Sequence, residues 1–113
     1  MTDDKEPKPR TVLHFLSGGK DIFGEWLDGL RDRAGRAAIL KRIDRVEEGN
    51  FGDYRPVGEG VFEIRVHFGP GYRVYYGLDG TRVVLLLCGG DKATQRRDVQ
   101  RAHGFWRTYR GMR

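Results

Sequence analysis

Residues 61–68, VFEIRVHF, decide the fold because apolar and polar side chains alternate from Phe62 to Phe68. A period of two is typical of a strand with one apolar face and one polar face. Gly69-Pro70-Gly71 then predicts a turn into residues 72–76, YRVYY, and Asp79-Gly80 predicts a hairpin into residues 82–88, RVVLLLC. The centre of the protein is therefore predicted to be a three-stranded antiparallel meander.

Two helices are predicted before this meander. Apolar residues recur at spacings of three and four between Asp21 and Leu30, which places them along one side of a helix. A second amphipathic segment with a mostly basic outer face follows Asp32 and stops at Gly49-Asn50. Residues 50–60 contain three glycines and a proline and are predicted to be a loop.

The two ends of the chain complete the predicted fold. Residues 11–16, TVLHFL, predict a first strand, and a last helix is predicted from Asp91 or Thr94 to about Phe105. Residues 1–9 are charged and proline-rich and are predicted to be a disordered tail, so that residues 10–113 form a single domain. The expected fold class is α+β, a small antiparallel sheet packed by helices in the order β-α-α-β-β-β-α.

The charge of the chain is unevenly distributed. Its 113 residues include 21 Lys and Arg against 16 Asp and Glu, a net charge of +5. Residues 92–113 hold seven basic residues and one acidic residue, so the positive end is the C-terminus. Such a segregated excess attracts polyanions, which leaves RNA, DNA and acidic protein open as partners.

Several classes of protein are excluded by composition. No stretch approaches the roughly 18 apolar residues of a membrane span, and the opening MTDD is unlike a secretory signal, so a cytoplasmic protein without membrane contact is expected. Cys88 lies in an apolar run and is expected to be a buried, unpaired thiol. The three histidines lack the spacing of metal ligands and no phosphate-binding glycine loop opens a helix, so neither a metal nor another cofactor is expected.

The polar face of the meander carries the residues that are suited to chemistry. If the apolar set of residues 61–68 faces the helices, the other set projects from the opposite side of the sheet. The polar set comprises Glu63, Arg65, His67, Arg73 and Tyr75, and Lys92 follows the last strand. These side chains are predicted to share one open, arginine-rich surface.

This grouping favours RNA as the partner. Arginine and lysine hold phosphate oxygens, an aromatic ring stacks on an unpaired base, and an imidazole transfers protons near neutral pH. Tyr75, with Arg96 and Arg97 of the last helix, is predicted to bind RNA. An exposed arginine or tyrosine on a strand is also an ordinary solvated feature, and both interpretations stay open on the pattern alone.

Three stretches resemble a known family: GVFEIR at residues 60–65, GPGYRVYY at residues 69–76 and LLCGGDKATQ at residues 86–95. They are similar to the HigB-like "addiction module killer" branch of the RelE/ParE toxin superfamily. The resemblance extends back through Trp26-Leu27 and the residues 49–53, GNFGD, and covers residues 20–103. It implies the same element order and a toxin of a type II toxin–antitoxin system.

The resemblance also implies an activity. RelE-like members cut messenger RNA, usually in the ribosomal A site and without metal, by activating a 2′-hydroxyl against the adjacent phosphate. The chain is thus expected to be an endoribonuclease, an mRNA interferase that inhibits translation. Matched by position, Arg73 falls on the family's phosphate-holding arginine, Arg65 on a strand lysine and Lys92 on a basic residue after the last strand. These cations would stabilise charge that builds on the phosphate in the transition state.

The chain departs from the RelE pattern at the groups that move protons. Glu63 stands where RelE has a second strand lysine, and Asp98-Val99 occupy the region of the tyrosine in its last helix. His67 is the candidate acid or base, with Glu63 in reserve.

Two other functions stay open at this point. The same superfamily includes ParE-like toxins, which inhibit DNA gyrase, and the basic last helix alone would suffice for a non-catalytic RNA-binding module. The resemblance further implies a helix-turn-helix antitoxin as partner, with DNA contacted only through the toxin–antitoxin complex.

Overall fold

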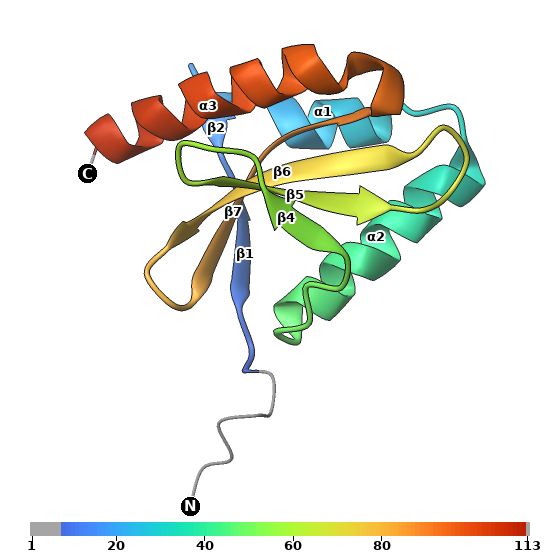
Figure 1. Ribbon diagram of the computed structural model, residues 1–113, viewed down its shortest axis with the longest axis horizontal. Helices are drawn as coiled ribbons and strands as arrows, with labels where there is room; N and C mark the ends of the chain where they lie inside the picture. Colours follow the sequence, from blue (N-terminus) through green and yellow to red (C-terminus); the bar gives the residue numbers. More distant parts are fainter. Residues whose placement is uncertain (1–7, 113) are drawn as a thin grey trace, which may run out of the picture.

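The computed structural model describes residues 8–112, and its helices and strands follow the predicted order with additions (Figure 1). The strands are β1 (Thr11–His14), β2 (Leu16–Ser17), β3 (Lys20–Asp21), β4 (Tyr54–Pro56), β5 (Val61–Val66), β6 (Tyr72–Asp79) and β7 (Val83–Asp91). The helices are α1 (Ile22–Asp28), α2 (Arg33–Glu47) and α3 (Gln95–Gly111), with a 3-10 turn at Lys92–Thr94 before α3. Most of the predicted tail, residues 1–7, lies outside the described residues. The α+β class is confirmed.

The main sheet contains the predicted meander at its centre. Its strand order is β1-β7-β6-β5-β4, with β5, β6 and β7 antiparallel to their neighbours in the meander. β1 pairs in parallel with β7, so the sheet, which is predicted to be antiparallel, has one parallel pair at this edge. A parallel pair needs a long connection, and both helices and the meander separate β1 from β7 in the chain.

The two faces of the sheet are both covered (Figure 1). On one face, Ile39 and Val46 of α2 pack with Ile64 and Val74. On the other face, Trp106 and its neighbours in α3 pack with the opposite set of strand side chains. The prediction that one face is open is therefore wrong, because α3 lies across it.

Three segments differ from their predicted extent. The predicted loop contains β4, which pairs with β5 and forms the outer edge of the sheet. β7 continues through both glycines to Asp91, and α3 continues past Phe105 to Gly111. None of the described helices is long and apolar enough to cross a membrane.

Aspartates begin the helices and fix where the chain turns. Asp21 and Asp32 accept hydrogen bonds from the backbone N–H of Gly24 and Gly35 at the starts of α1 and α2. The carboxylate of Asp91 accepts from the N–H groups of the 3-10 turn after β7. That turn sets the direction in which α3 crosses the sheet.

Candidate functional site

Glu63 on β5 is a carboxylate whose side chain is fully buried. Its Oε1 accepts hydrogen bonds from Arg55 Nε at 3.3 Å and Arg65 Nε at 3.2 Å, and lies 3.6 Å from Arg73 Nη1. Its Oε2 accepts from Gln95 Nε2, at the start of α3, at 2.9 Å. These four side chains, with Glu63 and Tyr75, form what we term the Glu63 cluster.

The groups around Glu63 keep its carboxyl group ionised. Burial alone would raise the pKa of Glu63, but the hydrogen bonds from Gln95 and Arg65, the nearby Tyr75 hydroxyl and the charge of Arg73 together hold that pKa below its usual value. Three arginines therefore surround one carboxylate that is ionised at neutral pH. The cluster carries more positive charge than its carboxylate neutralises.

Burial separates the members of the cluster. Tyr75 is fully buried and Arg73 nearly so, which corrects the prediction that both lie on an open surface. The cause is α3, which covers this part of the face. Burial and the charge of Glu63 raise the pKa of the Tyr75 hydroxyl. The Tyr75 hydroxyl and Arg73 Nε have no partner at hydrogen-bond geometry among the residues that the structure describes.

Two members of the cluster were not predicted from the sequence. Arg55 comes from β4, which pairs Arg55 directly with Glu63, and Gln95 begins α3. Arg55 lay in a segment predicted to be a loop, and its alternation is too short to indicate a strand. Gln95 was included in a stretch that resembles the toxin family, and that was its only signal.

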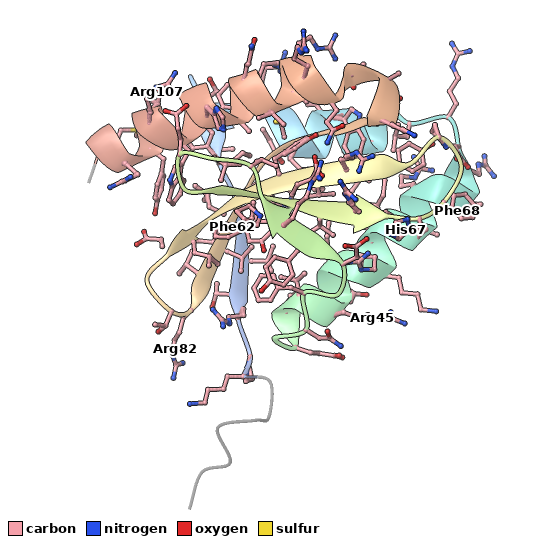
Figure 2. All side chains as sticks on the ribbon, in the orientation of Figure 1. Arg45, Phe62, His67, Phe68, Arg82 and Arg107 are labelled. Atoms are coloured by element: carbon pink, nitrogen blue, oxygen red, sulfur yellow. The ribbon has the colours of Figure 1, made fainter. Side chains whose placement is uncertain are left out.

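His67 lies outside the Glu63 cluster. It follows the end of β5, with Nε2 2.5 Å from Asp53 Oδ2, and 72% of its side chain is exposed. Figure 2 places His67 beside α2, and it lines a small pocket with Lys41 and Arg42 of that helix. The hydrogen bond from His67 is the largest cause that lowers the pKa of Asp53.

A row of polar residues nevertheless connects His67 to the cluster. Asp53, the partner of His67, accepts a backbone hydrogen bond from Arg65 at 3.0 Å, and Arg55 follows two residues later beside Glu63. Asp53 and His67 lie just beyond β4 and β5, so strand alternation does not place them on a face, but the positive charge of Arg65 contributes to lowering the pKa of Asp53. We call Arg55, Arg65, His67 and Asp53 the β4–β5 row.

The other predicted RNA-binding residues fall at separate places. Lys92 is exposed in the turn after β7, close to the end of the sheet where Tyr72 pairs with Asp91. Arg96 and Arg97 are adjacent in α3 but line different pockets. The predicted set thus does not form one continuous surface.

An open pocket of about 740 Å³ lies between α3 and the segment from β4 to β5. Arg55 and Gln95, which bind Glu63, also line it, together with Arg96 and His103. His103 Nε2 lies 2.9 Å from the carbonyl oxygen of Val57, and His103 Nδ1 lies 3.0 Å from Glu59. His103 therefore ties α3 to the loop that forms the opposite wall, a role that the sequence did not indicate.

Two further predictions concern Cys88, expected to be a buried thiol, and metal binding, which was not expected. Cys88 is buried, and burial raises the pKa of its thiol to about 12. Among residues 8–112, no three His, Cys, Asp or Glu side chains are grouped closely enough to hold a metal ion.

Comparison with known proteins identifies the family. The family of phage-derived Gp49-like proteins (DUF891) matches residues 25–103. An uncharacterized protein of Haemophilus influenzae is 46% identical over 80 residues, which span 71% of this chain and 81% of that protein. The chain belongs to the Gp49-like family, a toxin-like family of toxin–antitoxin systems. The narrower resemblance to HigB and RelE remains a prediction.

Acid is expected to destabilise this protein below about pH 5. The pKa values of Asp21, Asp32, Asp53 and Glu63 lie below their ordinary values of 3.8 for Asp and 4.5 for Glu. A carboxylate with a lowered folded-state pKa contributes stability that is complete above its unfolded pKa and is lost as the pH falls through the folded pKa. The midpoint of thermal unfolding, followed by circular dichroism, should therefore decrease between about pH 5 and pH 2.

The substitution Asp32→Asn provides the control for this pH dependence. Asp32 Oδ1 accepts from Gly35 N and Oδ2 accepts from the Tyr72 hydroxyl, both at 2.8 Å, and these bonds lower its pKa. The variant should lose part of the pH dependence while keeping the amide oxygen as a cap. An unfolding midpoint that is constant over this pH range would contradict the prediction.

Proposed function

We propose that this chain is the toxin of a type II toxin–antitoxin system and acts as a metal-independent endoribonuclease that cleaves messenger RNA, in the ribosome, and so inhibits translation. Membership of the Gp49-like family supports the proposal that the chain is a toxin. The observation that carries the ribonuclease is the β4–β5 row, in which two arginines held by a buried carboxylate lie next to an exposed His–Asp pair.

Exposure assigns different roles to the arginines of the cluster. The side chains of Arg55 and Arg65 are 48% and 29% exposed, whereas that of Arg73 is 10% exposed. Arg55 and Arg65 can therefore donate hydrogen bonds to an RNA phosphate while Glu63 fixes their orientation. Preorganised cations of this kind stabilise the negative charge of a phosphoryl transition state. In this proposal Arg73 and Glu63 are positioning residues, and Lys92 extends the cationic path at the end of the sheet.

His67 is the group proposed to move the proton. Its imidazole is exposed, and Asp53 binds one ring nitrogen and orients the ring. Imidazole would take the proton of the RNA 2′-hydroxyl as the 2′-oxygen bonds to phosphorus. The bond from phosphorus to the 5′-oxygen then breaks, and that oxygen takes a proton from water. Glu63 is less suited to this step because its carboxylate is buried and both its oxygens are occupied.

The test is to induce the chain in bacterial cells and map new RNA 5′ ends. Arg65→Ala should reduce cleavage by about a hundredfold, the usual effect of removing one preorganised donor to a transition state. His67→Asn should also abolish most cleavage, while Arg110→Ala, at an exposed position near the end of α3, should not reduce it.

Each alternative activity has its own outcome in this experiment. Growth arrest with unchanged RNA, retained by Arg65→Ala, would contradict the ribonuclease and favour inhibition of gyrase. RNA that is bound but uncut would indicate a non-catalytic RNA-binding module.

We also propose that a helix-turn-helix antitoxin is the partner and that DNA is contacted only through the complex. Such a partner would cover cationic surface that a free toxin exposes. Co-expression with the product of the adjacent reading frame should restore growth and yield a complex on purification. A harmless chain with no such neighbour would contradict the toxin proposal.

A further inference from the structure

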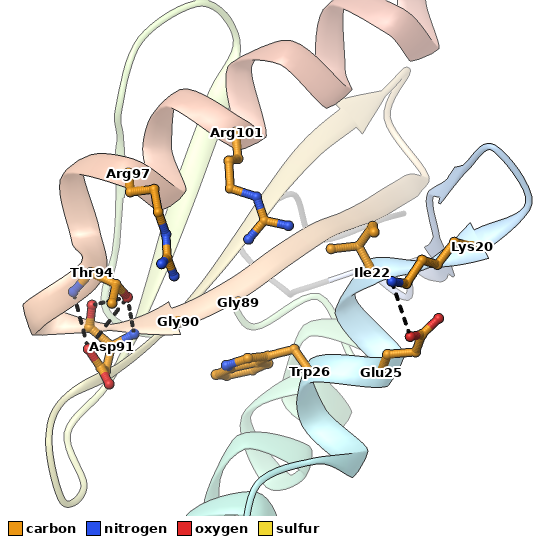
Figure 3. A pocket seen from close by; sticks show the side chains of 10 residues that line it. All are labelled: Lys20, Ile22, Glu25, Trp26, Gly89, Gly90, Asp91, Thr94, Arg97 and Arg101. Atoms are coloured by element: carbon orange, nitrogen blue, oxygen red, sulfur yellow. Dashed lines mark hydrogen bonds and ion pairs between the residues drawn. The ribbon is translucent and has the colours of Figure 1, made fainter.

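A pocket of about 370 Å³ lies beside Arg97 and Arg101 of α3 (Figure 3), whereas the pocket at Arg55 lies beside Arg96 and His103 of that helix. The pocket at Arg97 opens beside the C-terminal half of β7. β1 pairs with β7 only from Val83 to Leu86, so that half has no strand on its outer side, and α1 and α3 flank it there. We call this the Trp26 pocket.

An indole forms one wall of the pocket. Trp26 of α1 is partly exposed and packs against the backbone of β7 at Gly89. A Cβ atom at Gly89 would lie 2.3 Å from the Trp26 ring, so the ring rests directly on the strand. Trp26 also packs against Phe23 and Tyr72, with ring centroids 5.8 Å and 6.2 Å away. The part of the indole that stays exposed is an aromatic group of the kind against which nucleobases pack.

Two guanidinium groups form the opposite wall. Arg97 and Arg101 extend from α3 toward β7, facing the region of Trp26 (Figure 3). Both contact the fully buried Asp98, with Arg97 Nη2 and Arg101 Nη1 at 3.3 Å and 3.8 Å from Asp98 Oδ1. Asp98 Oδ2 is occupied by the Thr94 hydroxyl at 2.5 Å. The buried carboxylate thus orients two arginines and neutralises one of them.

The arginines remain available to a ligand. Both line the pocket, and their side chains are 66% and 41% exposed, so N–H groups that Asp98 does not bind are accessible to solvent. Lys20 adds a third cation, which Glu25 pairs at 3.6 Å. Asp91 also lines the pocket, but its carboxylate accepts hydrogen bonds from the N–H groups of the turn before α3. The pocket therefore combines one aromatic ring with two exposed guanidinium groups.

We infer that the Trp26 pocket binds one nucleotide of single-stranded RNA, with the base against Trp26 and the phosphate on Arg97 and Arg101. This inference rests on the proposed function, because it supplies an RNA subsite separate from the β4–β5 row. The pocket volume is within the range of small-ligand sites, about 300–1,000 Å³. An acidic peptide would use the arginines but leave the aromatic face without a matching flat group, so the pocket favours a nucleotide.

The experiment uses the full chain and the indole N–H signals of its two tryptophans in proton–nitrogen NMR spectra. Trp26→Phe identifies the Trp26 signal by its loss. Adenosine 5′-monophosphate should shift the Trp26 signal and leave that of the buried Trp106 in place. Adenosine and inorganic phosphate should each bind more weakly than the nucleotide that joins them.

The affinity measurement uses a 2′-O-methyl RNA hexamer, which has no free 2′-hydroxyl and cannot be cleaved by the proposed route. The double variant Arg97→Gln/Arg101→Gln should bind it at least about tenfold more weakly, since each charge-assisted hydrogen bond is lost. Arg110→Gln removes the same charge from α3 away from the pocket and should reduce binding much less. Both variants must give the wild-type circular dichroism spectrum.

The outcomes separate this inference from the nuclease. A chain that cleaves RNA but shows no shift of the Trp26 signal would overturn the nucleotide site alone. So would a double variant whose loss of binding free energy for the hexamer is only twice that of Arg110→Gln, because each arginine would then contribute the same. Tighter binding of a hexaglutamate peptide than of the hexamer would also overturn it, in favour of an acidic protein segment. A shifted Trp26 signal with no cleavage in cells would support the site and contradict the nuclease.

Discussion

Replacement of Glu63 by glutamine is expected to lower the free energy of unfolding by about 3–5 kcal/mol, the usual cost of removing one partner from a buried ion pair. Glu63 is fully buried, and Arg73 beside it has only 10% of its side chain exposed. With so little of its side chain exposed, the Arg73 guanidinium has little access to water in place of the carboxylate. The uncharged amide therefore leaves buried positive charge without a counter-ion, and urea unfolding followed by circular dichroism measures the loss.

Two further variants separate this explanation from a general effect of losing a carboxylate. Glu59→Gln removes a half-exposed carboxylate that binds Arg107 at 2.8 Å, and should cost about 1 kcal/mol or less. The double variant Glu63→Leu/Arg73→Met replaces both buried charges by apolar groups and should be more stable than Glu63→Leu alone. Wild-type stability of Glu63→Gln, or no recovery in the double variant, would contradict the role of the cluster.

The alternation in residues 62–68 predicted the meander correctly because alternation is a local property of a strand. The apolar set does face α2, as the burial of Ile64 and Val66 confirms. Phe68 is an exception, since β5 ends at Val66 and Phe68 is 40% exposed. A periodic pattern indicates which side chains share a face, and it does so only within the strand.

Alternation could not predict what covers the second face. The signal for that cover was the continuous apolar run VVLLLC in β7, because a strand that is apolar on both sides is buried on both sides. Leu86 packs on the α2 side and Leu87 on the α3 side, as this reasoning requires. The same run contains the buried Cys88, so it accounts for both the buried thiol and the cover by α3.

The candidate site was predictable only in part for a related reason. Glu63 and Arg65 are two residues apart on one strand, so their proximity follows from the sequence. Arg55 and Gln95 join them through the pairing of β4 and the path of α3, which depend on tertiary packing. The buried carboxylate and its three arginines come from segments that are distant in the sequence, so no local sequence pattern predicts that they meet.

Replacement of Gly77 by alanine is expected to lower the free energy of unfolding by about 3 kcal/mol, at the upper end of the usual cost of overpacking. Gly77 of β6 lies under the ring of Trp106, and a Cβ atom there would be 2.4 Å from Trp106 Cε3 and Cζ3. Gly77 has no positive φ angle, so alanine meets no backbone strain and the cost is purely steric. Trp106 would have to move, and α3 with it.

Gly104→Ala is the matched control, since the nearest atom to a Cβ at Gly104 of α3 would be Arg107 Nη2, at 3.9 Å. Alanine is the better helix former, and this variant should gain about 0.5–1 kcal/mol.

The clash at Gly77 can be assigned to Trp106 by a double-mutant cycle. Trp106→Leu removes the ring atoms that the new methyl group would strike while keeping an apolar side chain against Val61 and Leu87. In that background Gly77→Ala should cost about 1 kcal/mol or less, which gives a coupling of about 2 kcal/mol, in the range found for residues in contact. Equal costs in both backgrounds would mean that alanine disturbs the sheet itself. In that case the close packing of Trp106 on Gly77 would not be what holds α3 against the sheet over the Glu63 cluster.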